Sequence, residues 1–565
     1  MKSIVILSFI CLFVELSHGQ VLEVIDVFPA PQSLSAQAQV PIIITFNQPV
    51  EASTIDENSF RVSGRWSGHM DGQFVISGNG TVVIFIPDRP FFYGEWISVR
   101  LNFDIEGSST DPLTNGFGYN YWIKTLPASL NLTYDYEISM RMNGEPPIQC
   151  YGAYAGDIND DEFSDLTVVN EISGDIRVLL NDATGNYSDF TLFDMPDSSF
   201  PSTNQGSDFN HDGKIDIVIG SSGSDNVSVF MGNNVTLFDN EISYTADDGV
   251  TGLTVIDING DGWCDIVTAN SIGDNISFLT NDGTGSFSPP VNVDTGYTQE
   301  WAIASADLNG DGYTDLIVGA HGSDVIVTLL NDGTGSFIVT DAVSINGHPW
   351  MITIGDVNGD GDVDVASANS SSNTVSILFG DGNGNLNLSD HYAVGNFPLA
   401  IDLGDIDGDG DLDFISSNHG GGNFTLWENN GSGIFIDPIT YDAEQEGACT
   451  ILHDRNNDGA MDITFIDEAA DLVILYSNTL LLNANEETVL NDLVVYPNPV
   501  KDILRIENNS NSEVTSIKIY DLLGRLVLSV KEDFNQIDVS YLKSGVLFIT
   551  IETEEGAVTK KIIKQ

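Results

Sequence analysis

The nonapeptide Asp307-Leu-Asn-Gly-Asp-Gly-Tyr-Thr-Asp315 decides the fold of this protein, because its pattern of acids occurs seven times in the chain. The pattern is Asp-x-[Asp/Asn]-x-Asp-x-x-x-Asp, and its first residues are separated by 51, 49, 50, 49, 49 and 49 positions. Such regular spacing excludes chance. A repeat of about 40 to 50 residues is typical of a propeller or a solenoid.

Four segments with the composition of β-strands accompany each acidic loop. In the repeat around Asp307 these segments are 301–306, 313–320, 324–330 and 337–345. A turn, Asn331-Asp-Gly-Thr-Gly335, separates the last two, and its Asn and Gly residues supply the positive φ angles of a tight hairpin. Seven repeats of four antiparallel strands predict an all-β fold with a seven-bladed β-propeller.

The two ends of the repeat array predict how the ring closes. The seventh repeat is one strand short after Tyr476, whereas the stretch from Leu130 to Met140 precedes the first loop and resembles a fourth strand. We expect this stretch to complete the last blade, so that one sheet joins both ends of the ring and leaves no open edge.

The acidic loops are candidate calcium sites. Side chains at positions 1, 3, 5 and 9 and the carbonyl of position 7 can converge on one cation that prefers six or seven oxygen ligands. Oxygen donors without His or Cys disfavour zinc and copper, and Mg²⁺ would keep more waters in a tighter octahedron. An EF-hand would need a Glu at position 12 and flanking helices, which are missing here. The alternative that the loops are only acidic turns stays open.

We expect up to seven Ca²⁺ ions, one per blade. The expected ligands are Asp157, Asn159, Asp161, Phe163, Asp165; Asp208, Asn210, Asp212, Lys214, Asp216; Asp257, Asn259, Asp261, Trp263, Asp265; Asp307, Asn309, Asp311, Tyr313, Asp315; Asp356, Asn358, Asp360, Asp362, Asp364; Asp405, Asp407, Asp409, Asp411, Asp413; and Asp454, Asn456, Asp458, Ala460, Asp462. Six loops have Gly at position 6, where the chain turns sharply, but the first loop has Glu162. A non-Gly residue in such a conformation costs on the order of 1 kcal/mol, so the first site should be the weakest.

With these loops, residues 127–480 resemble the FG-GAP or VCBS repeats of integrin α-subunit propellers and of many secreted bacterial proteins. The resemblance implies calcium in the hairpin between the first and second strands of each blade. It implies no particular ligand, because proteins with these repeats include adhesins, lectin-like modules and domains attached to enzymes.

The N-terminal part of the chain predicts export and a β-sandwich. Residues 1–19 combine Lys2, an apolar run from Ile4 to Val14 and Ser17-His-Gly19, as a secretory signal peptide does, and we expect cleavage before Gln20. An uncleaved anchor is the alternative, although the run is shorter than the roughly 20 residues of a spanning helix. Residues 20–126 alternate apolar and polar positions, and Phe46-Asn-Gln-Pro-Val50 and Tyr121-Trp-Ile-Lys-Thr125 resemble SbsA-type Ig-like domains.

The C-terminal part, after a polar linker at 481–494, has a different composition. Residues 495–565 hold 9 of the 19 basic residues and are nearly neutral. They begin with Val495-Tyr-Pro-Asn-Pro499 and contain Ile517-Lys-Ile-Tyr-Asp-Leu-Leu-Gly-Arg525, and they resemble the type A sorting domain of the type IX secretion system of Bacteroidetes. The resemblance implies export by that machinery to the cell surface or the medium. A second Ig-like spacer is the alternative.

Composition limits the partners. The 83 acidic and 19 basic residues give a net charge of -64, which repels nucleic acid and anionic membranes. No segment after the leader is apolar enough to span a membrane, and we expect a monomer. After leader cleavage three cysteines remain, an odd number that argues against a disulfide framework. A single disulfide between Cys150 and Cys449, on first strands of neighbouring blades, is left open.

The face opposite the calcium hairpins is the expected binding surface for a glycan or protein ligand, because aromatic rings stack on sugars and peptides. It should carry Phe200, Trp301, His321, His348, Trp350, Phe397 and His419. The rings that begin the blades could instead pack between blades, and the histidines could be ordinary surface residues. The chain has no convincing catalytic motif, so we expect a binding or adhesion protein. A polysaccharide lyase or hydrolase on a propeller scaffold is the alternative.

Overall fold

In the computed structural model, the described residues are 21–108, 112–196, 199–481, 493–497, 499–508, 514–521, 526–531, 534, 536–543, 545–553 and 556–564. The chain divides into two compact units, Met1–Leu480 and Leu481–Gln565. The predicted signal peptide and most of the predicted linker lie outside the described residues. No α-helix is present in the described parts of either unit.

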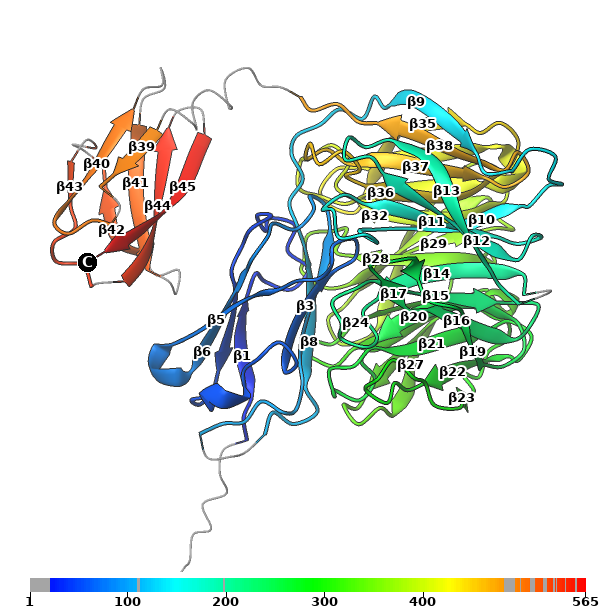
Figure 1. The fold of residues 1–565 in the computed structure, drawn as a ribbon, viewed down its shortest axis with the longest axis horizontal. Helices are drawn as coiled ribbons and strands as arrows, with labels where there is room; N and C mark the ends of the chain where they lie inside the picture. Colours follow the sequence, from blue (N-terminus) through cyan, green and yellow to red (C-terminus); the bar gives the residue numbers. More distant parts are fainter. Residues whose placement is uncertain are drawn as a thin grey trace, which may run out of the picture. The chain divides into compact units, whose positions relative to one another are not determined.

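Seven four-stranded antiparallel sheets between Thr133 and Ser477 form the blades of a propeller (Figure 1). The first four blades are β10 (Cys150–Gly156), β11 (Asp165–Asn170), β12 (Asp175–Asn181) and β13 (Tyr187–Asp194); β14 (Pro201–Ser207), β15 (Asp216–Ser221), β16 (Asn226–Phe230) and β19 (Ile242–Thr245); β20 (Val250–Ile256), β21 (Asp265–Asn270), β22 (Asn275–Leu279) and β23 (Val291–Val293); and β24 (Glu300–Ala306), β25 (Asp315–Ala320), β26 (Val325–Asn331) and β27 (Phe337–Ser344).

The last three blades follow the same order. They are β28 (Pro349–Gly355), β29 (Asp364–Asn369), β30 (Thr374–Gly380) and β31 (Leu386–Ala393); β32 (Pro398–Gly404), β33 (Asp413–Asn418), β34 (Asn423–Asn429) and β35 (Phe435–Asp442); and β36 (Gly447–His453), β37 (Asp462–Asp467), β38 (Leu472–Ser477) and β9 (Thr133–Ser139). A small hairpin, β17 (Gly232–Asn233) and β18 (Leu237–Phe238), extends the second blade, and η3 (His321–Ser323) and η4 (His419–Gly421) are 3-10 turns.

Burial explains the composition of the strands. All six residues of the second strand β25 are buried, because neighbouring blades cover both faces of each sheet, and such a strand is a nearly continuous apolar run. The outermost strand β27 keeps exposed and half-buried residues instead.

The ring closes as predicted from the sequence. Strand β9 pairs antiparallel with β38, from Thr133↔Ser477 to Ser139↔Leu472, so the last blade takes its outer strand from the region before the first blade. The last blade therefore holds both ends of the ring together.

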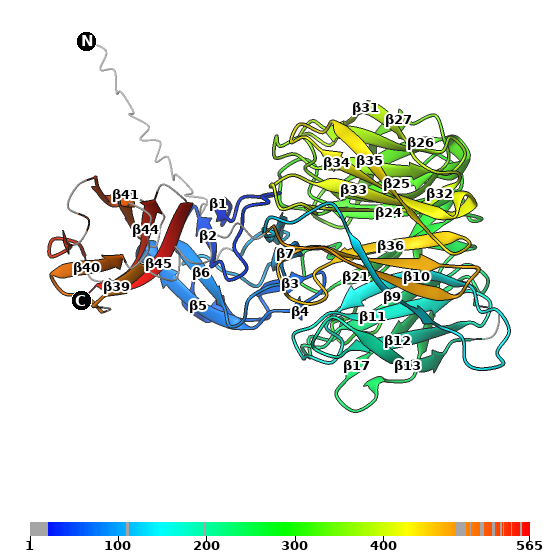
Figure 2. The ribbon, with the colours of Figure 1, turned by 90° about the horizontal axis from the view of Figure 1, so that it is seen from above.

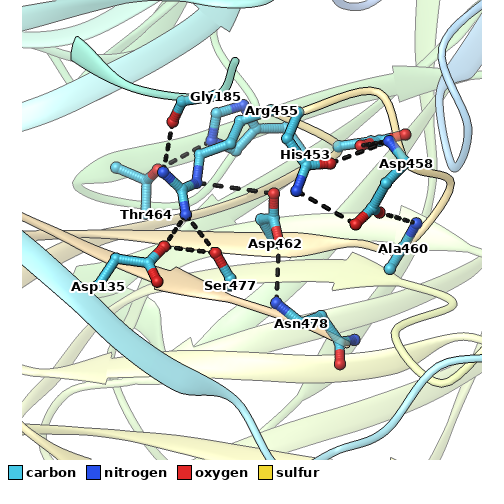
Figure 3. Close-up of polar contacts among 12 residues, drawn as sticks. Asp135, Gly185, His453, Arg455, Asp458, Ala460, Asp462, Thr464, Ser477 and Asn478 are labelled. Atoms are coloured by element: carbon cyan, nitrogen blue, oxygen red, sulfur yellow. Dashed lines mark hydrogen bonds and ion pairs between the residues drawn. The ribbon is translucent and has the colours of Figure 1, made fainter. Parts of the chain in front are cut away.

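A buried arginine reinforces this closure (Figure 3). Arg455 is position 2 of the seventh loop, and its guanidinium donates to the Gly185 carbonyl of the first blade and to the Asp135 carboxylate of β9. It also donates to Ser477 Oγ at 2.6 Å, and its Nε lies 3.6 Å from Asp462 Oδ2. One side chain thus connects the first blade, the last blade and the closing strand.

Residues 24–122 form a β-sandwich of two four-stranded sheets. One sheet has the order β1 (Val24–Phe28), β2 (Ile42–Phe46), β6 (Val82–Pro87) and β5 (Gly72–Ser77). The other has the order β4 (Gly68–His69), β3 (Phe60–Gly64), β7 (Trp96–Leu101) and β8 (Phe117–Trp122), and the 3-10 turns η1 (Ala52–Thr54) and η2 (Gly78–Gly80) lie in connections. The apolar faces enclose a core that includes Phe46, Phe60 and Tyr121.

The sandwich packs on the face of the propeller that carries the acidic hairpins. Figure 2 shows β3, β4 and β7 on its propeller side. Backbone hydrogen bonds of 2.7–3.3 Å join the sandwich, and the segment that follows it, to the loops. The Phe103 amide donates to a carbonyl of the third loop, that of Gly118 to the fourth, that of Leu126 to the seventh and that of Ala128 to the sixth. In the opposite direction, the Asp157 amide of the first loop donates to the Trp66 carbonyl. The resemblance to Ig-like domains did not predict this contact.

The second unit is a separate two-sheet fold. One sheet has the order β39 (Leu493–Tyr496), β40 (Ile503–Asn508) and β43 (Gln536–Asp538), and the other has the order β42 (Leu526–Val530), β41 (Val514–Asp521), β44 (Gly545–Thr553) and β45 (Gly556–Lys564). Its core includes Leu504, Ile519 and Ile549.

The three cysteines in the described ranges carry no cross-link. Cys150, Cys264 and Cys449 are buried and free, so the disulfide that the sequence left open between Cys150 and Cys449 is not formed.

Candidate metal centres and ligand face

Each of the seven acidic loops lies between the first and second strands of its blade, where the sequence predicted it. The 35 predicted ligand residues therefore fall into seven separate hairpins. The hairpin after β24 is representative: Asp307 accepts the amides of Gly310 and Gly312 at 2.8 Å, and Asp311 accepts the Tyr313 amide at 2.9 Å. These bonds hold the loop in its turned shape and keep the carboxylates close together.

The sixth loop shows how well the side chains suit a hard cation. One oxygen each of Asp405, Asp407 and Asp409 lies within 4.8 Å of the others. Asp405 Oδ1 is buried and has no hydrogen-bond partner within the described part of the chain. A buried carboxylate oxygen without a donor is costly, and a divalent cation would satisfy it. The donor set of the loop thus fits calcium.

The acid at position 9 has an additional structural role. Asp315 is fully buried, and its two carboxylate oxygens accept the amides of Leu308 at 2.9 Å and Asn331 at 2.8 Å. It therefore ties the loop to the third strand of its blade. Burial raises the pKa of its counterparts Asp165, Asp216 and Asp364 to about 8.

These raised pKa values predict how the metal-free protein responds to pH. Because the folded pKa of about 8 lies far above the usual Asp value, the folded state binds protons that the unfolded state has released between about pH 4 and pH 8. The stability of the metal-free protein should therefore fall as pH rises from 5 to 8. Calorimetry of demetallated protein checks this, and a melting temperature that rises over that range would contradict it.

Position 6 has the backbone conformation that the sequence predicted. The Gly residues at this position have φ between 83° and 101° in six loops, and Glu162 in the first loop has φ 68°. Glu162 is thus a non-Gly residue in the left-handed region, which is strained.

Replacing this glutamate should strengthen the first loop. We expect Glu162→Gly to stabilise the calcium-loaded protein by about 1 kcal/mol, because the strain at this φ is removed. The matched control is Gly213→Glu in the second loop, where φ is 84° and a Cβ meets no atom within 4 Å, so steric clash is absent. The Gly213→Glu variant should therefore be less stable than the natural chain by a similar free energy. Equal unfolding free energies for Glu162→Gly and the natural chain, measured by denaturant titration, would contradict the prediction.

Two features of the repeat were missed in the sequence. Position 4 is also left-handed in every loop, and it holds Asp160, His211, four Gly residues and Asn457. The sequence could have indicated this conformation, because position 4 holds mostly Gly, Asn and Asp, the residues that tolerate a left-handed backbone.

The second missed feature is the Asn that starts the turn after the third strand. Asn331 donates to the Ile258 carbonyl of the preceding blade at 3.0 Å and to Thr314 at 3.2 Å. Equivalent bonds to a neighbouring blade come from Asn181, Asn281, Asn429 and Asn478. Asn331 was predicted from the sequence only as a turn former, but it and its counterparts also hold blades together.

Six of the seven predicted ligand-face residues form one continuous cluster. Trp301 lies 4.1 Å from Trp350 and 4.8 Å from His321, and His321 stacks on His348 at 4.5 Å, measured between ring centroids. Phe397 continues the cluster from Trp350 at 5.4 Å to His419 at 6.1 Å. We call these six residues the aromatic cluster.

The aromatic cluster lies at the start of the first strands, whereas the acidic loops follow their ends, so the two are on opposite faces of the ring. All six side chains are half-buried, so they are neither core residues nor isolated surface residues. Phe200, the seventh predicted residue, lies directly before the first strand β14, is 42% exposed and joins no ring contact among the described residues.

Polar partners fix the orientation of several of these rings. Trp350 Nε1 donates to the Tyr151 hydroxyl across the ring at 3.0 Å, and His348 Nδ1 lies 2.6 Å from Asp324 Oδ1. His419 Nε2 lies 3.2 Å from Glu468, which raises the pKa of this histidine. The cluster therefore combines apolar faces with oriented polar groups, as sites for sugars and peptides do.

Comparisons with known proteins identify two parts of the chain. Residues 208–268, 257–318, 307–367, 356–416 and 405–465 match the FG-GAP-like repeat, and residues 494–565 match the secretion system C-terminal sorting domain. The matched repeats contain the second to seventh loops, and the first loop, with Glu162, lies outside them. No curated protein matches the chain.

Among solved structures, virginiamycin B lyase from Staphylococcus aureus is 13% identical, with a TM-score of 0.44, over 61% of this chain and 99% of that chain. An Agrocybe aegerita lectin that recognises non-reducing terminal N-acetylglucosamine is 16% identical, with a TM-score of 0.37, over 76% and 99%. BBS1N in complex with ARL6DN is 11% identical, with a TM-score of 0.45, over 63% and 98%.

The families found include no enzyme family. Across the described ranges, no helix has the length and apolar character needed to cross a membrane. The chain is thus an all-β protein with FG-GAP-like repeats and a secretion system C-terminal sorting domain, and it is secreted or exported to the cell surface.

Proposed function

We propose that this protein is a calcium-binding propeller that acts outside the cell as a binding or adhesion module for a glycan or protein ligand. The observation that carries the proposal is the aromatic cluster, which is half-buried on the face opposite the acidic loops. The sandwich binds to the loop face, and the aromatic cluster lies on the opposite face.

Calcium has a structural role in this proposal. The residues that would hold it are the acids and asparagines of positions 1, 3 and 5, the carbonyl of position 7 and the acid of position 9. A bound ion supplies positive charge among carboxylates that otherwise repel one another. The loops shape each hairpin and present the carbonyls to which the sandwich binds.

The proposal includes the parts of the chain that flank the propeller. Residues 1–19 are a signal peptide, 20–126 an Ig-like sandwich, 127–480 the propeller, 481–494 a linker and 495–565 a type A sorting domain. That tail directs the monomeric protein through a type IX secretion system, as in Bacteroidetes. The structure supports the sandwich reading by its two packed sheets.

The proposal is tested by glycan and protein arrays probed with calcium-loaded protein. We expect retention that is lost in Trp350→Leu, because this change removes a central ring of the aromatic cluster. The matched control Phe28→Leu changes an exposed ring of the sandwich strand β1, and this variant should bind the arrays as the natural chain does. Binding that is unaffected by Trp350→Leu would contradict the assignment of the face.

The alternative of a polysaccharide lyase or hydrolase is tested on the same material. New reducing ends on incubation with marine and plant polysaccharides would favour the enzyme. Retention on polysaccharides without new reducing ends would favour the binding module.

A further inference from the structure

A cavity of about 410 Å³ lies inside the ring. The first strands of the blades form its wall, and strands β3, β7 and β8 of the sandwich form one end. Trp301 and Trp350 of the aromatic cluster also line it. This volume is in the range of roughly 300–1,000 Å³ that small ligands occupy. The cavity therefore extends from the sandwich toward the proposed ligand face.

Cationic side chains gather at the sandwich end. Residues 20–480 contain nine basic residues in total, and three of them, Arg61, Arg65 and Arg100, line this one cavity. Arg61 and Arg100 are direct partners across the β3–β7 pair. Like charges opposite each other destabilise a sheet, so the fold gains nothing from this arrangement by itself.

Two of the acids that line the cavity form close ion pairs with its arginines. Arg61 Nη2 lies 2.8 Å from Asp208, and Arg65 Nη1 lies 3.1 Å from Asp402. The third acid, Asp257, accepts backbone amides of its own loop.

Arg100 donates only to Cys264 Sγ at 2.6 Å and Ser63 Oγ at 3.0 Å. Its Nε is buried and has no hydrogen-bond partner among the described residues. A guanidinium stays charged at any ordinary pH, and Arg100 donates to no carboxylate among the described residues, although the charge of Asp257 acts on it from a longer distance.

The guanidinium group of Arg65 is accessible within the lining of the cavity. Its side chain keeps 36% of its area accessible although it pairs with the buried Asp402 and lies between the sandwich and the ring. The neighbouring His69 is held neutral, because burial and then the charge of Arg61 lower its pKa to about 4. The sandwich end of the cavity therefore carries three guanidinium groups, of which that of Arg65 is accessible, beside the carboxylates of Asp208, Asp257 and Asp402.

The remaining lining suits a sugar chain. Ser207, Thr254, Ser305 and Thr353 offer hydroxyl groups, which both donate and accept hydrogen bonds, as sugar hydroxyls require. Five residue steps separate Trp301 from the end of β24, a length of about 16 Å, so a short oligosaccharide could reach from the rings to the arginines.

We propose that the cavity binds the acidic end of an oligosaccharide, with a carboxylate or sulfate group at Arg65 and Arg100 and a sugar ring at Trp301 and Trp350. This inference rests on the proposed function and names its ligand class. Arginine pairs well with a planar carboxylate or with sulfate oxygens through two parallel hydrogen bonds, and in this site such a group would give Arg100 a hydrogen-bonded anion.

The test is titration calorimetry of the full calcium-loaded chain with digalacturonate and with its neutral methyl ester. We expect digalacturonate to bind at least tenfold more tightly than the ester. Arg100→Met, which keeps an apolar stem but removes the charge, should abolish this preference. The matched control Arg141→Met removes an arginine that does not line the cavity and should preserve it.

A second variant keeps the test decisive if Arg100→Met does not fold. Ser305→Trp fills the cavity from the propeller wall without touching the arginines, and it should weaken digalacturonate binding at least tenfold. Equal affinity for the acid and its ester, or full affinity in Ser305→Trp, would overturn this inference and leave glycan binding by the aromatic face intact. Absence of any glycan or protein ligand on the arrays would instead overturn the proposed function.

Discussion

Removing calcium should lower the melting temperature of the protein by more than about 10 °C. A site held at 100 times its Kd contributes about 2.7 kcal/mol, and the seven loops act on one cooperative ring. In the empty loops, buried acids such as those at positions 1 and 9 lie close to one another, and this raises their pKa values further beyond the effect of burial. The calorimetric experiment compares protein in chelator with the same sample after calcium is restored.

Removal of calcium should also weaken the contact between the sandwich and the propeller loops. The amides of Gly118 and Leu126 donate to loop carbonyls at 2.7 and 2.8 Å, so their hydrogen exchange should accelerate when the loops lose calcium. Amides of β6, inside the sandwich, are the control and should change less. An unchanged melting temperature after chelation would contradict a structural role for the metal. So would an equal acceleration of hydrogen exchange at the Gly118 and Leu126 amides and at the amides of β6.

Arg455→Ile should destabilise the propeller by about 3–5 kcal/mol. Isoleucine is the residue of this position in three other loops, at 158, 258 and 406, so the backbone accepts it. The cost arises because the substitution removes the guanidinium donor of the Asp135 carboxylate and of the Gly185 carbonyl, and leaves Asp462 without its cation. Denaturant unfolding in calcium measures the change.

Two variants control this experiment. Lys124→Ile removes an exposed cation and should change stability by less than about 0.5 kcal/mol. Arg455→Ile combined with Asp135→Asn should recover part of the loss, since one unpaired charge is removed. A loss below about 1 kcal/mol for Arg455→Ile would show that β9 pairing alone holds the ring closed.

The repeat, its loops and the closing strand could be predicted because they depend on local chemistry that recurs. Each acidic loop is encoded in nine consecutive residues, and the missing strand after Tyr476 has its counterpart before the first loop. The aromatic residues could be assigned to one face by strand position, but their contact in one cluster depends on side-chain packing across three blades.

The interior site could not be predicted because it depends on contacts between distant parts. Arg100 lies 164 residues from Cys264, and Arg61 lies 147 residues from Asp208. Nothing in the sandwich sequence indicates which side of it meets the ring. Arg455 did leave a signal, since a charged residue stands where the six other loops have an apolar one, but a single exception does not reveal its partners.

The most direct test of the account is the number of calcium ions bound per chain, measured by elemental analysis after equilibrium dialysis against millimolar calcium. The account predicts close to seven, with the first loop the first to empty as calcium is lowered. A value of zero or one ion would contradict it, because the hairpins would then be ordinary acidic turns.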